Sequence, residues 1–229
     1  MDVVKKIFMY TKKFFIVIGL FLLSQISINV FDIAKRISQA SGVASLSLVV
    51  SIILILMVIG NIWLLVFLAK KLGFFTIKFD FLTGRNIGII IGGYVLARIV
   101  AIVGTLLLNA QGMNSTANDA AIQTMFTGEN PLLIILLIGI SAPIMEEIVF
   151  RGGIIGFWLK DYPIVGVVLS SVVFGLVHGP TNLISFLIYG LIGLILSVVY
   201  HKTKRLELSI AIHFLNNILI AIMIAFGLV

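Results

Sequence analysis

Long apolar windows recur along the whole sequence, with short polar segments between them. A helix needs about 20 predominantly apolar residues to cross the hydrocarbon core of a membrane. The candidate windows lie at approximately 14–30, 43–69, 86–108, 131–157, 163–179, 182–200 and 207–228. They predict an all-α, polytopic membrane helix bundle with about seven transmembrane helices, within a range of six to eight. Because no internal repeat or linker stands out, residues 1–229 are expected to form a single integral membrane domain.

The composition supports a membrane protein and excludes several other classes. Hydrophobic residues make up 61% of the chain and charged residues only 11%, with a mean hydropathy of +1.24. The net charge of +7 comes from short basic clusters between the apolar windows, so membrane lipids are expected partners and nucleic acid is not. The chain has no cysteine, which excludes disulfides, cysteine-ligated zinc and thiol nucleophiles.

The basic clusters also predict an orientation. They lie before residue 14, in the segment Lys70–Arg85 and at 202–205, which fall on one side if the seven spans alternate. Short basic loops stay in the cytoplasm, so the amino terminus is expected inside the cell and the location is expected to be the plasma membrane. The polar segment 109–130 has no lysine or arginine and is expected outside, while Lys35 and Arg36 are the exception to the pattern.

Several ionisable residues fall inside the apolar windows, where a charged side chain costs about 2.5 to 3.5 kcal/mol on insertion scales. Such residues tend to face the interior of a bundle and to serve a function. They are Arg98, Glu146, Glu147, Arg151, His178 and His213. Arg98 is expected to pair inside the bundle or to bind a lipid headgroup, and it is not predicted to be catalytic.

The spacing within the stretch APIMEEIVFRGG separates its two carboxylates. Glu147 and Arg151 are four residues apart, so they share a helix face and can form an ion pair. Glu146 points about 100° away from Glu147 around a helix. One carboxylate can therefore be structural while the other is free for chemistry.

Two further windows carry polar residues at the same spacing. Phe174 and His178 share a helix face in FGLVHGP, and His213 and Asn217 share one in IHFLNN. If the bundle directs these side chains inward together with Glu146, they form a compact polar site.

These three motifs, EExxxR, FxxxH and HxxxN on successive windows, resemble those of the CPBP family of CAAX prenyl proteases and bacteriocin-processing enzymes, also called the abortive-infection family. The resemblance covers about residues 131–229, which would be the catalytic core. It implies an intramembrane endopeptidase that hydrolyses a peptide bond in a membrane-associated, leader or prenylated peptide. By this likeness Glu146 and His178 activate a water molecule, and His213 and Asn217 hold the oxyanion.

The resemblance gives the remaining motif residues supporting roles: Glu147 and Arg151 brace the helix, and Phe174 shapes the pocket. The use of a metal is left open, because Glu146, His178 and His213 also form an acceptable three-ligand set for a divalent ion such as zinc. Otherwise no cofactor is required.

Other classes of membrane protein are weighed against this interpretation. The chain lacks the HExxH of zinc metalloproteases and a GxGD aspartate pair, and Gly139 to Ala142 matches a rhomboid serine motif only in part. A non-catalytic bacteriocin-immunity or regulatory protein of the same fold, and a transporter, are the alternatives. The substrate could be a CAAX protein, a bacteriocin leader or a signalling-peptide precursor, and the sequence indicates no oligomeric state.

Overall fold

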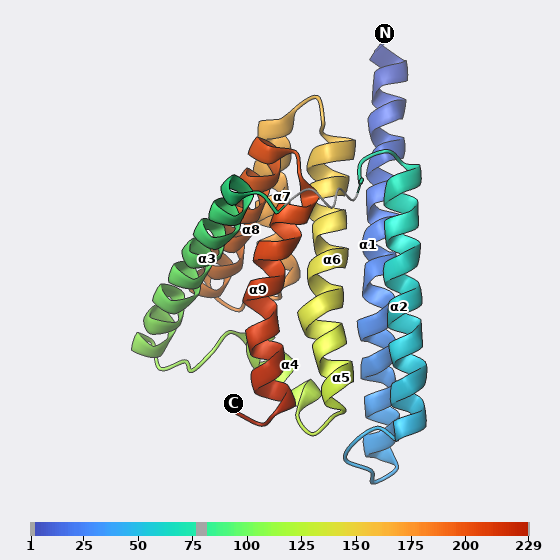
Figure 1. Cartoon of the computed structure of the whole chain (residues 1–229), viewed down its shortest axis with the longest axis vertical. Helices are drawn as coiled ribbons and strands as arrows, with labels where there is room; N and C mark the ends of the chain where they lie inside the picture. Colours follow the sequence, from blue (N-terminus) through green and yellow to red (C-terminus); the bar gives the residue numbers. More distant parts are fainter. Residues whose placement is uncertain (1–2, 77–81, 229) are drawn as a thin grey trace.

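The computed structural model describes residues 3–76 and 82–228, and within them the chain is helical and contains no strand. Its α-helices pack as a bundle with their axes roughly along one direction (Figure 1). This confirms the predicted all-α polytopic bundle. The helices are α1 (Val3–Ala40), α2 (Leu48–Lys71), α3 (Gly84–Ala110), α4 (Ala117–Phe126), α5 (Pro131–Ile134), α6 (Ala142–Glu147), α7 (Pro163–Val177), α8 (Leu183–Thr203) and α9 (Leu206–Ala225).

Six helical stretches in the described residues are long and apolar enough to cross a membrane. They are α1, α2, α3, the continuous stretch Pro131–Trp158, α8 and α9. Large apolar side chains such as Ile53, Trp63 and Leu106 are exposed on the outer faces of the first three, as expected for helices that contact lipid. The protein is an integral membrane protein.

The window expected at 163–179 forms a shorter helix than the others. Helix α7 has 15 residues and is therefore about 22 Å long, against a hydrocarbon core of about 30 Å. Gly179 has a positive φ of 59° and Pro180 follows it, so the helix cannot continue. The turn between α7 and α8 consequently lies well short of the lower ends of α1 and α2 (Figure 1).

The stretch Pro131–Trp158 is one long helix in which short α-helical parts alternate with π-helical segments. The π segments are Ile135–Ser141 and Ile148–Trp158, on either side of α6. Segments with i→i+5 hydrogen bonds are rare and often mark functional sites. Both carboxylates of the EExxxR motif lie in α6, between the two π segments.

The polar segment 109–130, expected as a loop, contains the short helix α4. Thr116 is its N-cap, and the threonine hydroxyl accepts a hydrogen bond from the amide of Asp119. The sequence analysis missed this helix because most of its residues are exposed and polar or small, so no apolar periodicity marks it.

A buried ion pair explains the exception in the pattern of basic residues. Lys35 pairs with Glu129, both side chains are buried, and the lysine also donates to the carbonyl of Ala44 at 2.7 Å. Glu129 in turn accepts from the amide of Leu46 at 3.0 Å. This pair fixes the end of α1 to the segment that leads into α5, so the charge of Lys35 is neutralised within the fold.

Candidate active site

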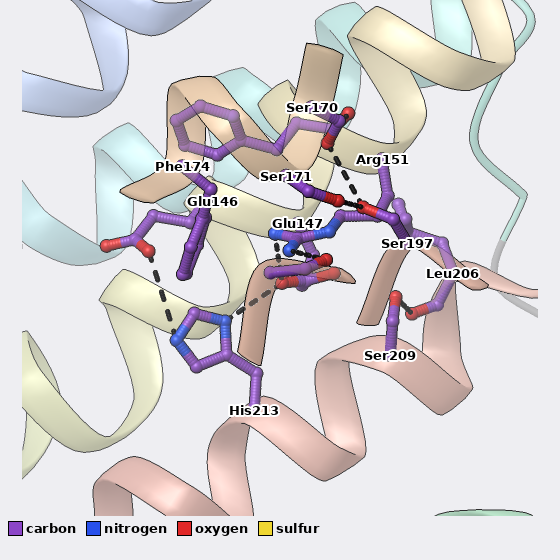
Figure 2. A network of polar contacts seen from close by, with 12 residues as sticks. Glu146, Glu147, Arg151, Ser170, Ser171, Phe174, Ser197, Leu206, Ser209 and His213 are labelled. Carbon is purple, nitrogen blue, oxygen red and sulfur yellow. Dashed lines mark hydrogen bonds and ion pairs between the residues drawn. The ribbon is translucent and has the colours of Figure 1, made fainter. Parts of the chain in front are cut away.

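Glu147 and Arg151 form the ion pair that their spacing predicts, in the interior of the bundle. Both side chains are completely buried, and Arg151 Nη1 lies 2.9 Å from Glu147 Oε1 (Figure 2). Arg151 Nη2 donates to the carbonyl of Gly193 on α8 at 2.9 Å, and the guanidinium lies over the Phe174 ring at 4.4 Å. The pair therefore links the long helix to α7 and α8.

His213 lies between the two adjacent carboxylates (Figure 2). Its Nδ1 is 2.9 Å from Glu147 Oε1, and its Nε2 is 3.9 Å from Glu146 Oε2. Because a carboxylate accepts and Glu147 Oε1 already accepts from Arg151, Nδ1 of His213 is the donor to that oxygen. Glu147 thus fixes His213 as well as Arg151, a second contact that the helical spacing alone could not predict.

The two carboxylates differ in their surroundings. The Glu147 side chain is fully buried, whereas that of Glu146 is 23% exposed. The Oε2 atom of Glu146 is shielded but makes no hydrogen bond within the described part of the chain. An unpaired carboxylate oxygen in such a place is a ready acceptor for a water molecule or a substrate N–H group.

His178 caps the end of α7 with its imidazole held on two sides. Its Nδ1 lies 2.7 Å from the Phe174 carbonyl, and its ring stacks on Tyr189 with centroids 4.2 Å apart. Because a carbonyl oxygen only accepts, Nδ1 carries the hydrogen and Nε2 of the neutral ring carries the lone pair. The imidazole can therefore accept a proton at Nε2.

A backbone irregularity holds Asn217. The amide of Ala142 donates to the Leu137 carbonyl five residues back, and the next residue, Pro143, has no N–H to give. Under this pattern the Ile138 carbonyl loses its helical donor. The Asn217 side chain lies 3.4 Å from that carbonyl oxygen and donates to it. One carboxamide hydrogen is thereby directed at the backbone, and the second remains available.

Arg98 lies behind this asparagine. It is half-buried on α3, and its guanidinium lies 3.4 Å from the Asn216 side-chain oxygen. The Asn216 amide group lies 3.4 Å from the Asn217 oxygen. Arg98 therefore has a partner inside the bundle, as expected, but that partner is the neutral amide of Asn216. Arg98 does not line the cavity described next.

A cavity of about 340 Å³ brings the motif residues together. Glu146, Phe174, His178, His213 and Asn217 all line it, so every candidate with a predicted direct role faces the same space. Its other walls come from α1, α4 and the π segment before α6. Asp119 lines the cavity and is exposed, so the cavity reaches the surface beside α4.

The structure therefore places the predicted residues in two layers. Glu147 and Arg151 lie behind the cavity wall, and the other candidates lie on it. The chemical roles given to them stay predictions. The sequence analysis missed Tyr189 and Asn216, which also line the cavity. Tyr189 carries a weak signal, since it is an aromatic residue with a polar tip inside an apolar window.

The side chains considered as metal ligands are not closely grouped in the described structure. Within residues 3–76 and 82–228, no three histidine, aspartate or glutamate side chains are grouped closely enough to hold an ion. In both histidines Nδ1 is held by a hydrogen-bond partner, the Phe174 carbonyl for His178 and Glu147 for His213, which leaves Nε2 for other contacts. The set of Glu146, His178 and His213 considered for zinc stays a prediction.

Comparison with known proteins agrees with the motifs. Residues 128–219 match a family model described as "Type II CAAX prenyl endopeptidase Rce1-like". The three motifs all fall in this range. Residues 128–219 form an Rce1-like region. The resemblance proposed from EExxxR, FxxxH and HxxxN is thereby confirmed.

The curated relatives described next are bacterial proteins, and two of them are named as membrane proteins. The chain is 27% identical to the UPF0177 protein YvdC of Lactococcus lactis subsp. lactis (strain IL1403), over 56% of this chain and 49% of that protein. It is 36% identical to the putative membrane peptidase YdiL of Bacillus subtilis (strain 168), over 40% and 37%. It is 27% identical to the membrane-embedded CAAX protease MroQ of Staphylococcus aureus (strain USA300), over 55% and 53%.

The chain thus spans about half or less of the length of these relatives. No solved structure matches it significantly. Helices α1 to α4 all lie outside the Rce1-like region, although α1 and α4 contribute walls of the cavity.

Proposed function

We propose that the protein is an intramembrane endopeptidase that hydrolyses a peptide bond with a water molecule activated by Glu146 and His178. The observation that carries the proposal is the unpaired Glu146 carboxylate oxygen, which faces the same cavity as the motif histidines and asparagine. The Rce1-like region and relatives named as peptidases support proteolysis as the activity.

Each cavity residue has a step that suits its geometry. Glu146 Oε2 accepts a proton from water as the water oxygen attacks the carbonyl carbon, and His178 Nε2 supplies a second acceptor that orients this water. When the C–N bond breaks, the proton taken from water passes to the leaving nitrogen. The carboxylate is then regenerated, so atoms and charge balance over one turnover.

The oxyanion is stabilised by two side chains of α9. Asn217 offers its second N–H, and a protonated His213 offers Nε2–H while Nδ1–H stays bound to Glu147. Donors fixed before the reaction stabilise developing charge strongly where water is excluded. Glu147 and Arg151 act indirectly, because they hold His213 in this orientation.

The cavity indicates a peptide substrate with an apolar segment next to the scissile bond. Most of its lining is apolar, including Phe21, Ile28, Ile122 and Met125, and its polar groups gather at the motif residues. A CAAX protein, a bacteriocin leader and a signalling-peptide precursor all offer such a segment. Membrane lipids are proposed as the surrounding partner.

Cleavage of these three peptide types by the purified protein tests the proposal. The variants Glu146→Ala, His178→Ala and His213→Ala are expected to lower turnover on the order of 100-fold or more, while folding and insertion remain. His201→Ala is the matched control, since this third histidine lies at the end of α8 outside the cavity and its variant should keep full activity.

A chelator provides a separate arm of the same assay. Because no step uses a metal, incubation with EDTA is expected to leave cleavage unchanged. If EDTA abolished cleavage and zinc restored it, the proposed activation of water by Glu146 without a metal would be wrong. Absence of cleavage for every peptide would favour a non-catalytic member of the fold.

A further inference from the structure

Tyr189, on α8, lies directly against the proposed catalytic histidine. Its ring is nearly parallel to the His178 imidazole, with an interplanar angle of 15° and centroids 4.2 Å apart. Phe174 also contacts the imidazole, with centroids 4.6 Å apart in a tilted geometry. The bond from Nδ1 to the Phe174 carbonyl fixes one end of the imidazole, and the Tyr189 ring fixes its plane.

The hydroxyl of Tyr189 is held by the amino-terminal end of α4. It donates to Asp119 Oδ1 at 2.9 Å. In return it accepts from the Thr116 hydroxyl at 2.7 Å and from the Asn118 side-chain amide at 3.2 Å. Its donor and both lone pairs are therefore used, and every partner comes from a segment outside the Rce1-like region.

Helix α4 lies along one side of the cavity and is attached to the rest of the fold at both of its ends. At one end are the contacts to Tyr189, and at the other Phe126 is fully buried and stacks on Phe31 of α1 at 4.5 Å. Between these points Ile122 and Met125 line the cavity, while most of the helix is exposed. Ile122 and Met125 also pack against the apolar cluster around Phe126, so the contacts to Tyr189 are the polar part of the attachment of α4.

We propose that Tyr189 is a positioning residue for His178, and that α4 holds Tyr189 in place through Asp119, Thr116 and Asn118. The site then consists of the Rce1-like motifs together with a helix from outside that region. Docking of α4 fixes the plane of the imidazole, and with it the direction of the Nε2 lone pair toward the water. The catalytic part of this assignment rests on the proposed function.

Kinetics of Tyr189 variants test the role in turnover, with a peptide that the unaltered protein cleaves. Tyr189→Leu removes the stacked ring and is expected to lower kcat on the order of 10- to 100-fold with little change in KM, because misplacing a catalytic group by a small distance has this effect. Tyr189→Phe keeps the ring but loses the hydroxyl contacts to α4, so its kcat should lie between those of Tyr189→Leu and the unaltered protein. The control is Tyr200→Leu, a buried tyrosine of the same helix that does not line the cavity.

A double-mutant cycle tests the connection to α4. Asp119→Ala removes the acceptor of the Tyr189 hydroxyl, so it should lower kcat in the protein with Tyr189 but have no further effect in the Tyr189→Phe background, where the hydroxyl is missing. Equal losses in both backgrounds, or equal kcat for Tyr189→Leu and Tyr200→Leu, would overturn the proposal.

Histidine NMR gives a readout that does not require proteolysis. The chain has only three histidines, so protein labelled with ¹⁵N-histidine in detergent gives few imidazole signals. Tyr189→Leu and Asp119→Ala should each shift and broaden the His178 signals, assigned with His178→Ala, while the His201 signals stay unchanged. His178 signals that neither variant alters would refute the positioning role even if the protein is a protease. If the signals change but no peptide is cleaved, the proposed function fails and the structural connection stands.

Discussion

Glu146 and Glu147 are neighbours in sequence but lie in different environments. Replacing each of them with glutamine should therefore have different effects on stability and turnover. Glu147→Gln leaves Arg151 without its countercharge in the interior, and breaking a buried pair costs roughly 3 to 5 kcal/mol. We expect a lower melting temperature and poor membrane accumulation. Because Glu147 also holds His213, turnover per folded molecule should fall as well.

Glu146→Gln strands no arginine, because Arg151 pairs with Glu147, and the neighbour of Glu146 is His213 at 3.9 Å. We expect a melting temperature near that of the unaltered protein and turnover lower on the order of 100-fold or more, the usual effect of losing a general base. Melting temperature and cleavage rate measured together for both variants check this. An unstable Glu146→Gln that keeps its turnover would reverse the two assignments.

The spacing of the motif residues predicted some contacts of the site and missed others. The spacing of four residues correctly predicted the pair of Glu147 and Arg151, because the stretch remains helical between them. It could not predict that His213 bonds to Glu147, since that contact joins residues 66 positions apart. The support for Asn217 was equally hidden, because it depends on the missing N–H of Pro143 just after a π-helical segment.

At the level of elements, α4 should determine which substrates fit. Met125 lines the cavity, and Met125→Trp would fill part of its volume. We expect kcat/KM to fall on the order of 10-fold for peptides with a bulky apolar residue beside the scissile bond, and little for those with alanine there. Gln123→Trp, at an exposed position of the same helix, is the control. Equal losses for both peptides would show that Met125 does not set the size of the pocket.

The end of α1 allows a matched comparison of two adjacent basic residues. Lys35→Met leaves Glu129 buried without its partner, and we expect destabilisation of roughly 3 to 5 kcal/mol. Arg36→Met breaks only the exposed pair with Asp32, and we expect little change in stability because exposed pairs are screened by solvent. Thermal unfolding in detergent measures both. Similar melting temperatures for the two variants would mean that the buried pair does not stabilise this end of the bundle.

Apolar windows located most elements because each long window must become a helix to satisfy its backbone in lipid. They could not locate the end of α7, which depends on the backbone at Gly179, or the helix α4, which has no continuous apolar face. Both elements border the cavity. The sequence therefore predicted the motif residues of the site more completely than the walls around them.

At the scale of the whole molecule, the basic segments gather at one end of the bundle. Lys6 bonds to Tyr162, Tyr10 to Asp161, and the Phe74 ring contacts Phe157, so three chain segments meet there. The opposite end holds α4, the α1–α2 connection and the carboxyl terminus (Figure 1). If the basic end is cytoplasmic, the cavity opening beside α4 faces the outside, and substrates reach the site from that face.

Cysteine labelling tests this orientation in a chain that has no native cysteine. Ser115 is exposed just before α4, so Ser115→Cys should react with a membrane-impermeant maleimide in intact cells. Lys202→Cys, exposed at the basic end of α8, should react only after the cells are permeabilised. The reasoning is that short basic loops resist translocation, and the pairing of Lys35 with Glu129 removes the main charge that opposes this pattern. If Lys202→Cys but not Ser115→Cys were labelled in intact cells, the orientation would be the reverse of the one predicted. The opening of the cavity would then face the cytoplasm.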